Sequence, residues 1–345
     1  TLVTLAITAA ALAVNYYMWQ VELHVLPLAL TLYTLSAIYT INMLFGYLIE
    51  TRSRQHMDGL FGQYVPPDLV KEMSRDPENY SLASQKRELS VLFTDIRSFT
   101  TISEGLEADE LSTLMDEYLT PMTRIVHETQ GTIDKYIGDA VMAFWGAPVF
   151  HPHHADQAVG GGMAMLTALE ELNEDFAEKG WPEIRIGVGV NTGMMSVGNM
   201  GSAFRRAYTV LGDAVNLGSR LEGITKAYGV DFIVSEATAK AAGRYAYREL
   251  DRVRVKGKEK PVTILEPIGL IEELTLIQKN KIDSFDRFLF LYRSQHWDRA
   301  LADLEKMREA QGDCLLFDLY QERIEHFREN PPGEDWDGVF VHTSK

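Results

Sequence analysis

Cysteine is almost absent from this sequence, and positive charge is scarce. The single cysteine, Cys314, excludes an internal disulfide, so we expect any catalytic part to face a reducing compartment. The 345 residues include 33 lysines and arginines against 49 aspartates and glutamates, which gives a formal net charge of −16. Nucleic-acid binding requires clustered basic residues, so nucleic acid is not an expected partner. The pattern G-x-x-x-x-G-K-[ST] is also missing, which excludes a P-loop protein.

Charge is missing from two long stretches near the start of the chain. Residues 1–19 and 25–49 contain no Asp, Glu, Lys or Arg. Because about 20 apolar residues span a bilayer as a helix, we predict that residues 1–49 form two transmembrane helices. Arg52 and Arg54 follow, and basic residues favour the cytoplasmic side. The sequence thus predicts a multi-pass protein of the inner (plasma) membrane, held in the lipid bilayer with its later residues in the cytoplasm. A buried hairpin of a soluble domain and a signal sequence are the alternatives.

The regions on either side of the central part have helical patterns. Residues 50–87 are expected to form a juxtamembrane connector whose first helix, over residues 50–63, ends before Pro66 and Pro67, since proline lacks the amide hydrogen. Residues 269–345 are expected to form a C-terminal helical tail. Tyr292, Trp297 and Leu301 form an apolar stripe there, weakly similar to a tetratricopeptide unit. This stripe fits either packing against the rest of the chain or a partner-binding groove.

The central region, residues 88–268, alternates between strand and helix patterns. Apolar residues recur at helical spacing in three segments, which predict helices over residues 108–129, 154–180 and 214–229. Gly229 is a suitable C-cap for the last of them. The Gly138-Asp139 pair indicates a hairpin turn within residues 131–146. Further strands are expected over residues 89–96 and 232–238, a strand pair over residues 184–193 and 194–201, and a hairpin over residues 253–268.

Two aspartates follow apolar strands that are expected to lie side by side. Asp95 ends the strand 89–96, and Asp139 occupies the hairpin turn. An aspartate in either place is ordinary, but two carboxylates meeting at one sheet edge suit Mg²⁺, which binds one or two carboxylates together with substrate phosphates. After Asp95 a helix is expected to begin near Phe99 and Thr100, and its free N–H groups can bind phosphate oxygens. These features predict a two-metal site for nucleotide phosphates.

A polar pair lies on one face of the helix 214–229. Asn216 and Arg220 are four residues apart, so they share a helix face. An amide and a guanidinium there can hold a ribose and a phosphate, because arginine binds phosphate oxygens in a bidentate manner. The alternative is a solvated helix face with a surface contact between Arg220 and Glu222.

Three segments together resemble the signatures of class III nucleotidyl cyclases. They are "FTDIRSFTTISE" at residues 93–104, "DKYIGDAVMAFWGAP" at residues 134–148 and "RRAYTVLGDAVNLGSRLE" at residues 205–222. The resemblance covers residues 88–268, about half of the chain, in the family's order. It implies an α+β, ferredoxin-like catalytic domain that works as a head-to-tail homodimer with its sites at the interface. One copy would supply the metal ligands and the other copy the residues that hold the nucleotide.

The resemblance also implies roles for individual residues on the metal and base sides of the site. Asp95 and Asp139 match the ligands of two Mg²⁺ or Mn²⁺ ions, and Ile96 would add a backbone carbonyl. Lys135 matches the residue that recognises the adenine ring. Thr209 stands where many members have aspartate, and its oxygen can still accept from the adenine amino group.

The ribose and phosphate side is matched by three further residues. Asn216 corresponds to the ribose-orienting residue and Arg220 to the transition-state residue. Lys256, or else Lys258, matches a lysine that reaches the terminal phosphates, and Arg205 or Arg206 can assist there. The implied reaction converts ATP to 3′,5′-cyclic AMP and pyrophosphate.

The identity of the base distinguishes the competing hypotheses. The Lys135 ammonium is a pure donor, which suits adenine N1, so we predict an adenylate cyclase. A guanylate cyclase and a catalytically inactive receptor with the same fold are the alternatives. A diguanylate cyclase or palm-type polymerase gives no role to Asn216 and Arg220. Residues 53–73 also resemble the transducer segment of membrane-bound bacterial cyclases. This resemblance implies a truncated sensory domain upstream, with regulation passing through the membrane segment and the connector.

Overall fold

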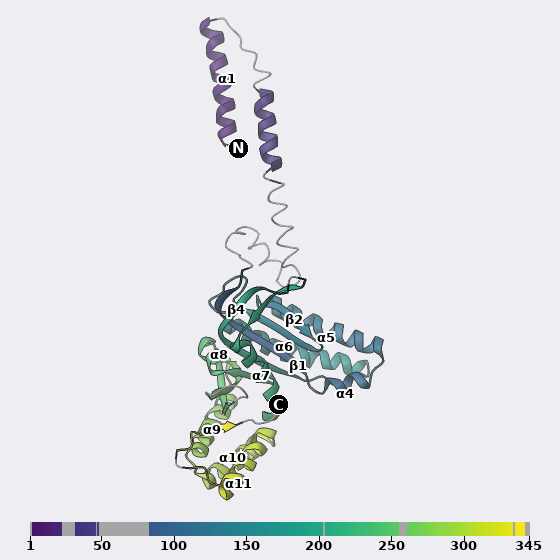
Figure 1. Ribbon diagram of the computed structural model, residues 1–345, viewed down its shortest axis with the longest axis vertical. Coiled ribbons are helices and arrows are strands. Elements are labelled where there is room, and N and C mark those ends of the chain that lie inside the picture. Colours follow the sequence, from purple (N-terminus) through teal and green to yellow (C-terminus); the bar gives the residue numbers. More distant parts are fainter. Residues whose placement is uncertain are drawn as a thin grey trace. The chain divides into compact units, whose positions relative to one another are not determined.

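The computed structural model describes residues 2–22, 32–45, 47, 83–202, 204–254, 261–333 and 335–341. The chain divides into two compact units. Unit 1 contains residues 1–63 and 70–77, and unit 2 contains residues 64–69 and 78–345. Each unit is described by itself (Figure 1).

Unit 1 contains helix α1 (Leu2–Glu22) and a second helix over residues 32–45. Among the residues that the structure describes, no helix combines the length and the apolar character needed to cross a bilayer. The predicted pair of membrane spans is therefore not supported. α1 carries Asn15, Gln20 and Glu22 in its second half, and the described residues 32–45 of the second helix, at 1.5 Å per residue, extend over about 21 Å. Membrane localisation stays a prediction, and the connector predicted over residues 50–87 lies outside the described residues up to residue 82.

Unit 2 is built on one mixed sheet, which has nine strands within the described residues. Its main path runs β2-β3-β1-β4-β6-β8-β7-β9, and β5 pairs with β4. The first four strands on this path, with α5 between β1 and β2 and α6 between β3 and β4, form the predicted ferredoxin-like arrangement. The strand bounds are β1 Gln85–Ile96, β2 Thr132–Ile137, β3 Ala140–Trp145, β4 Ile186–Gly201, β5 Arg206–Leu211, β6 Phe232–Ser235, β7 Tyr245–Arg254, β8 Val262–Leu270 and β9 Phe340–Val341.

Helices cover both faces of this sheet. Side chains alternate between the two faces of a strand, and β1 is buried on both. Leu92 belongs to the apolar cluster that includes α5 and α6, whereas Val91 faces Gly218 of α7. Figure 1 shows α5 and α6 side by side and α7 apart from them. The helices of this region are α4 Phe99–Glu104, α5 Ala108–Glu128, α6 His154–Glu178, α7 Asp213–Tyr228 and α8 Glu236–Ala241.

The strand pair predicted over residues 184–193 and 194–201 is wrong. Residues 186–201 form the single long strand β4, which pairs without interruption with β1 from Gln85 to Ile96. The predicted boundary between the two strands falls at Gly193, but Gly193 lies within β4 opposite Leu89. A Cβ at Gly193 would lie 3.3 Å from the Cβ of Ala214 on α7. This glycine therefore permits close helix packing rather than a chain reversal.

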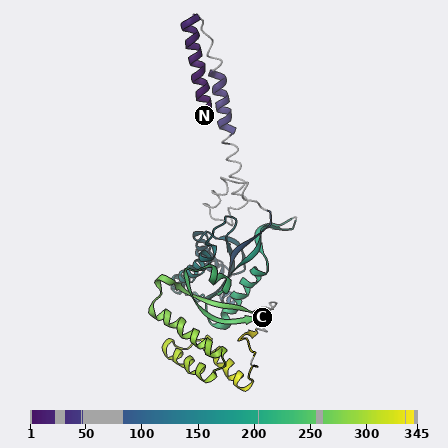
Figure 2. The same cartoon turned by 90° about the vertical axis from the view of Figure 1, so that its left-hand side faces the viewer.

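The C-terminal region is helical, as predicted, and it packs against the sheet domain. It contains α9 (Leu276–Arg293), α10 (Trp297–Gln311) and α11 (Leu315–Glu329). Figure 2 shows these helices, coloured from green to yellow, gathered together at one end of unit 2. Their apolar side chains form one buried cluster with residues of α7 and β7, including Leu221, Tyr228 and Leu250. The stripe that contains Tyr292 is buried in this cluster, so it serves packing within the chain.

A buried ion pair fastens α11 to the sheet domain. The Arg323 guanidinium donates to Asp251 Oδ2 through Nη1 at 2.7 Å and to Tyr228 Oη through Nη2 at 3.2 Å. Tyr228 Oη in turn donates to Asp251 Oδ2 at 2.6 Å. The side chains of Arg323 and Asp251 are only 5% and 1% exposed. Because Tyr228 is the last residue of α7, this network connects the C-terminal helices to the end of that helix.

Replacing Arg323 by methionine is expected to destabilise the protein by about 3–5 kcal/mol, because the carboxylate of Asp251 loses its partner inside the protein. Urea unfolding measures this change. Arg287→Met is the matched control, since Arg287 also pairs with an aspartate, Asp303, but its own side chain is 59% exposed. That substitution should cost less than about 1 kcal/mol. Equal losses in the two variants would contradict the account.

Candidate active site

Asp95 and Asp139 are brought together by antiparallel pairing. β1 and β3 run in opposite directions, with Thr94 opposite Val141, so the end of β1 meets the turn that precedes β3. Asp95 lies at that end, and Asp139 lies in the turn between β2 and β3. The backbone N–H of Ile96 donates to Asp139 Oδ2 at 3.0 Å. The predicted meeting of the two carboxylates at one edge of the sheet is therefore present.

The electrostatics of this pair favour a cation. Partial burial, a hydrogen bond with Asp139 and the charge of Asp139 together raise the pKa of the Asp95 carboxyl to about 6, while a hydrogen bond from the Ile96 backbone opposes them. Two such carboxylates are hard oxygen donors, and they match the few protein ligands that Mg²⁺ takes beside phosphates. The described residues contain no larger cluster of three or more His, Cys, Asp or Glu arranged for a metal. The pair therefore fits ions that share their ligands with a substrate.

The two residues predicted at the start of the following helix lie on α4. Phe99 is half-buried against the cluster beneath α5 and α6, whereas Thr100 is exposed. Ser98 precedes them in the left-handed region, with φ of 57°, and no side chain caps the helix there. Phe99 thus anchors the short helix, and Thr100 is the one of the two that is open to a ligand.

α7 presents Asn216 and Arg220 from its first turns. Asn216 is exposed and Arg220 is half-buried. The Nη1 atom of Arg220 is buried and has no hydrogen-bond partner among the described residues. No ion pair joins Arg220 to Glu222 in this part of the chain, so the alternative of a surface contact is not observed. An unpaired buried donor is costly, and this one fits an anion such as a phosphate.

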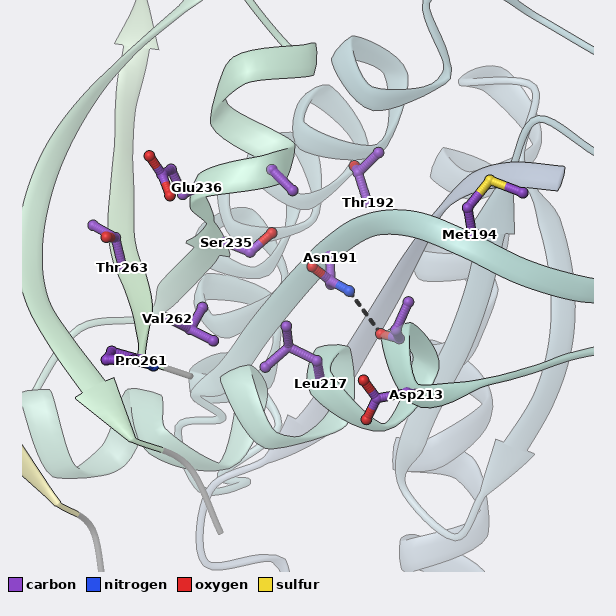
Figure 3. A pocket seen from close by; sticks show the side chains of 12 residues that line it. Asn191, Thr192, Met194, Asp213, Leu217, Ser235, Glu236, Pro261, Val262 and Thr263 are labelled. Atoms are coloured by element: carbon purple, nitrogen blue, oxygen red, sulfur yellow. Dashed lines mark hydrogen bonds between the residues drawn. The ribbon is translucent and has the colours of Figure 1, made fainter. Parts of the chain in front are cut away.

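The start of α7 is fixed by the central strand. Asn191 of β4 donates its side-chain amide to the carbonyl of Ala214 at 2.7 Å (Figure 3). No side chain caps the start of α7, because the residue before it, Gly212, has no side chain. The bond from Asn191 instead holds this end of the helix through a side-chain contact. Asn191 and Ala214 line a pocket of about 410 Å³ between β4, α7, α8 and β8. None of the residues predicted for the active site lines that pocket.

Lys135 and Thr209 meet around a third residue, Asp134. Lys135 lies on β2 with its side chain half-exposed, and its Nζ is 3.0 Å from Asp134 Oδ1. Thr209 lies on β5 and donates its hydroxyl to Asp134 Oδ2 at 2.5 Å. The structure thus connects the two residues that were predicted to recognise the base. Lys256 and Lys258 lie outside the described residues, and Arg205 and Arg206 are exposed.

The sequence reasoning missed two acidic residues. Asp134 received no role from the sequence, yet it is 2% exposed. Glu222 was read as a surface residue, yet it is half-buried. Burial and the charge of Asp95 together raise the pKa of Glu222 to about 7, while the charge of Arg97 opposes them. Both residues fall inside the quoted motifs. Their burial depends on contacts with residues distant in the sequence, so the motifs alone gave no signal for it.

Comparison with known proteins decides the family. A model described as the adenylate and guanylate cyclase catalytic domain matches residues 82–265, more than half of the 345-residue chain. The chain belongs to this family. The cyclase domain therefore includes β1 to β7 and part of β8, and the resemblance seen in the sequence motifs is confirmed.

Two curated proteins similar to this chain are named as adenylate cyclases. Adenylate cyclase 1 of Rhizobium meliloti is 36% identical over 212 residues, and adenylate cyclase of Anabaena cylindrica is 34% identical over 216 residues. These matches cover 61% and 60% of this chain but only 32% and 42% of the relatives. This chain thus matches less than half the length of either relative.

Among solved structures, the adenylyl cyclase CyaB from P. aeruginosa is 36% identical with a TM-score of 0.52. The guanylyl cyclase Cya2 is 34% identical with the same TM-score. The matches cover 56% of this chain in both cases, and 100% and 98% of the solved chains. They support the class III cyclase α+β fold. Because the two proteins are named for different nucleotides, overall similarity does not decide the base for this chain.

Replacing Asp95 by asparagine is expected to stabilise the metal-free protein at about pH 8 but not at about pH 4. The pKa of Asp95 is raised to about 6 in the folded protein. The free energy of unfolding therefore keeps the contribution of the protonated Asp95 carboxyl at low pH and loses it as the pH rises through that value. Thermal unfolding in a chelator measures the difference. Asp116→Asn, at an exposed position of α5, is the control and should show no such pH dependence. An Asp95→Asn protein that unfolds at lower temperature than wild type at about pH 8 would contradict this electrostatic reading.

Proposed function

We propose that this protein is an adenylate cyclase, a lyase that converts ATP to 3′,5′-cyclic AMP and pyrophosphate. The observation that carries the proposal is the paired carboxylates of Asp95 and Asp139 together with the unpartnered buried donor of Arg220. A metal–triphosphate substrate would satisfy both groups, because its metal ions can bind the two carboxylates and its phosphates can accept hydrogen bonds from the Arg220 guanidinium. The curated relatives named above as adenylate cyclases support this substrate.

The metal-binding role falls to three residues. Asp95 and Asp139, with the backbone carbonyl of Ile96, would hold two Mg²⁺ or Mn²⁺ ions. Such ions lower the pKa of the ribose 3′-hydroxyl and neutralise the triphosphate. The raised pKa of Asp95 means that this carboxyl must lose its proton before it can bind a cation. Metal affinity should therefore fall as the pH drops below about 6.

The remaining site residues orient the nucleotide and stabilise charge. Asn216 holds the ribose so that O3′ lies in line with the α-phosphorus. The bond from O3′ to the α-phosphorus forms, the 3′-hydroxyl proton passes to solvent water, and the bond from the α-phosphorus to the oxygen shared with the β-phosphate breaks, so that pyrophosphate leaves. Arg220 donates hydrogen bonds to the α-phosphoryl oxygens as their negative charge grows. Lys256 would contact the terminal phosphates and the departing pyrophosphate.

The proposal includes a homodimer with a site at each end of its interface. Asp95 and Asp139 of one copy would face Arg220 and Asn216 of the other. Exposed apolar side chains on the strands that carry the site support such an interface, because solvent-exposed apolar patches mark interaction surfaces. These side chains are Tyr136 and Ile137 on β2, Met194 on β4 and Leu211 on β5.

Guanylate cyclase activity is the second candidate, because the guanylyl cyclase Cya2 is nearly as similar as the adenylyl cyclase CyaB. The exposed donor group of Lys135 favours adenine N1 over guanine N1–H. Turnover of ATP and GTP by the purified protein, with the cyclic product identified, separates the two. Regulation through residues 1–87 remains an expectation from the sequence.

Replacing Arg220 by alanine is expected to lower kcat for ATP by about 10²–10³, because a preorganised donor to the transition state is lost. KM should change much less. Steady-state cyclic AMP formation measures both. Arg287→Ala, in the C-terminal helices, is the control and should keep the wild-type rate. A full rate in Arg220→Ala would remove this residue from the mechanism.

Mixing two inactive variants tests the shared site. Asp95→Ala lacks a metal ligand, and Arg220→Ala lacks the donor, so each alone should be almost inactive. In an equal mixture, random pairing makes half of the dimers mixed, and each mixed dimer contains one intact site of two. Activity should therefore recover to about a quarter of wild type. No recovery, in a mixture shown to exchange subunits, would contradict a site formed between copies.

A further inference from the structure

Asp134 occupies an unusual place beside the base-recognition residues. β2 and β3 pair Ile133 with Ala143 and Lys135 with Met142, so Asp134 is the extra residue of a β-bulge. A bulge leaves one residue without a partner and re-aims the neighbouring side chains, and bulges are common next to active sites. Here the bulge makes Ile133 and Asp134 both buried, while Lys135 is exposed. The buried carboxylate of Asp134 thereby lies in contact with β5.

The two oxygens of Asp134 face donors from both strands. Oδ2 accepts from the Thr209 hydroxyl at 2.5 Å and from the backbone N–H of Val210 at 3.2 Å. Oδ1 lies 3.0 Å from the Lys135 ammonium, as an ion pair without the alignment of a hydrogen bond. A carboxylate only accepts hydrogen bonds. The single hydroxyl hydrogen of Thr209 must therefore point at Asp134.

We propose that Asp134 is a positioning residue that makes this site select adenine over guanine by fixing the hydrogen-bond polarity of Thr209 and Lys135. A free threonine hydroxyl can donate or accept. With its hydrogen committed to Asp134, Thr209 presents only lone pairs to a ligand. The Lys135 ammonium has no lone pair and presents only donors. The edge that meets the base thus has one acceptor and one donor in fixed places.

This polarity matches adenine and opposes guanine in the same pose. The inference rests on the proposed function, in which Lys135 faces N1 of the base and Thr209 faces its 6-substituent. Adenine offers an acceptor at N1 and an amino donor at the 6-position, so both contacts are satisfied. Guanine offers N1–H against the Lys135 ammonium and O6 against the Thr209 lone pairs. Both contacts then place like groups together, and a site built for hydrogen bonds rejects such a ligand strongly.

The inference is tested first by substituting Asp134. Asp134→Asn keeps the shape of the side chain but replaces one oxygen acceptor by an amide donor. If the amide NH2 faces Thr209, the Thr209 hydroxyl no longer has to donate to residue 134; if the NH2 faces Lys135, two donors meet there. The ratio of kcat/KM for ATP to that for GTP should fall by at least about tenfold, the effect of losing one well-formed hydrogen bond to a charged group. Asp156→Asn is the matched control, since Asp156 is a buried aspartate that accepts from the backbone N–H of Arg244. Its ratio should be that of wild type.

A double substitution shows whether Asp134 acts through Thr209. Thr209→Val removes the acceptor and should lower the ATP-to-GTP ratio, whereas Thr209→Ser keeps the hydroxyl and should keep the ratio. Adding Asp134→Asn to Thr209→Val should then have little further effect on the ratio. A merely structural role of Asp134 would lower turnover of both nucleotides alike and leave the ratio unchanged, and that result overturns the inference.

The wild-type protein tests the polarity without any substitution, in case Asp134→Asn fails to fold. Inosine triphosphate has N1–H and O6 like GTP but lacks the 2-amino group. Its equilibrium binding, measured by displacement of a fluorescent ATP analogue, should be at least about tenfold weaker than that of ATP. Binding as tight as ATP overturns the inference even if cyclic AMP is formed. A folded protein that forms no cyclic AMP but still prefers ATP to inosine triphosphate overturns the proposed function and leaves the polarity of the site supported.

Discussion

The structure of the site depends on two carboxylates held together at the end of one strand and the turn before another. Antiparallel pairing of β1 with β3 forces Asp95 and Asp139 to meet, and the Ile96 backbone N–H holds the second of them. Partial burial, together with the hydrogen bond and the like charge of Asp139, raises the pKa of Asp95 to about 6. The fold tolerates this arrangement in the absence of a cation only at some cost in stability. Divalent ions and a triphosphate bound at the site would offset this cost.

The second half of the proposed chemistry is carried by one helix that is fixed at both ends. At its start, Asn191 of β4 holds the Ala214 carbonyl. At its end, Tyr228 is bound by the buried pair of Asp251 and Arg323. The C-terminal helices therefore brace α7, which presents Asn216 and Arg220. Because the orientation of a donor in the transition state decides its value, this bracing would hold Arg220 in place for the proposed reaction.

Local patterns in the sequence predicted most of the catalytic domain. The strand before Asp95, the hairpin around Asp139 and the helix that ends at Gly229 each depend on neighbouring residues, and all are present. Features that depend on distant pairing were not predicted. The burial of Asp134 follows from a bulge opposite β3. The single strand β4 was predicted as two strands that meet at Gly193, because the packing of Gly193 against Ala214 of α7 depends on a residue distant in the sequence.

Composition alone was a weaker guide than these patterns. The uncharged stretches at the start predicted membrane spans, but the helices described there are too short or too polar to support them. The catalytic motifs were more informative, because each placed a chemically distinct group next to a strand end or on one helix face. Even so, the motifs do not show which way a hydroxyl points. The direction of the Thr209 hydroxyl, which bears on the choice between adenine and guanine, follows only from its contact with Asp134.

The most direct test of the central claim is a crystal structure with Mn²⁺ and an ATP analogue that cannot cyclise, examined for the anomalous signal of manganese. The account predicts two manganese peaks in contact with the carboxylates of Asp95 and Asp139, and an α-phosphate within hydrogen-bond distance of Arg220 from a second copy. A nucleotide bound without any manganese between the two carboxylates, or held by Arg220 of the same copy, would contradict it.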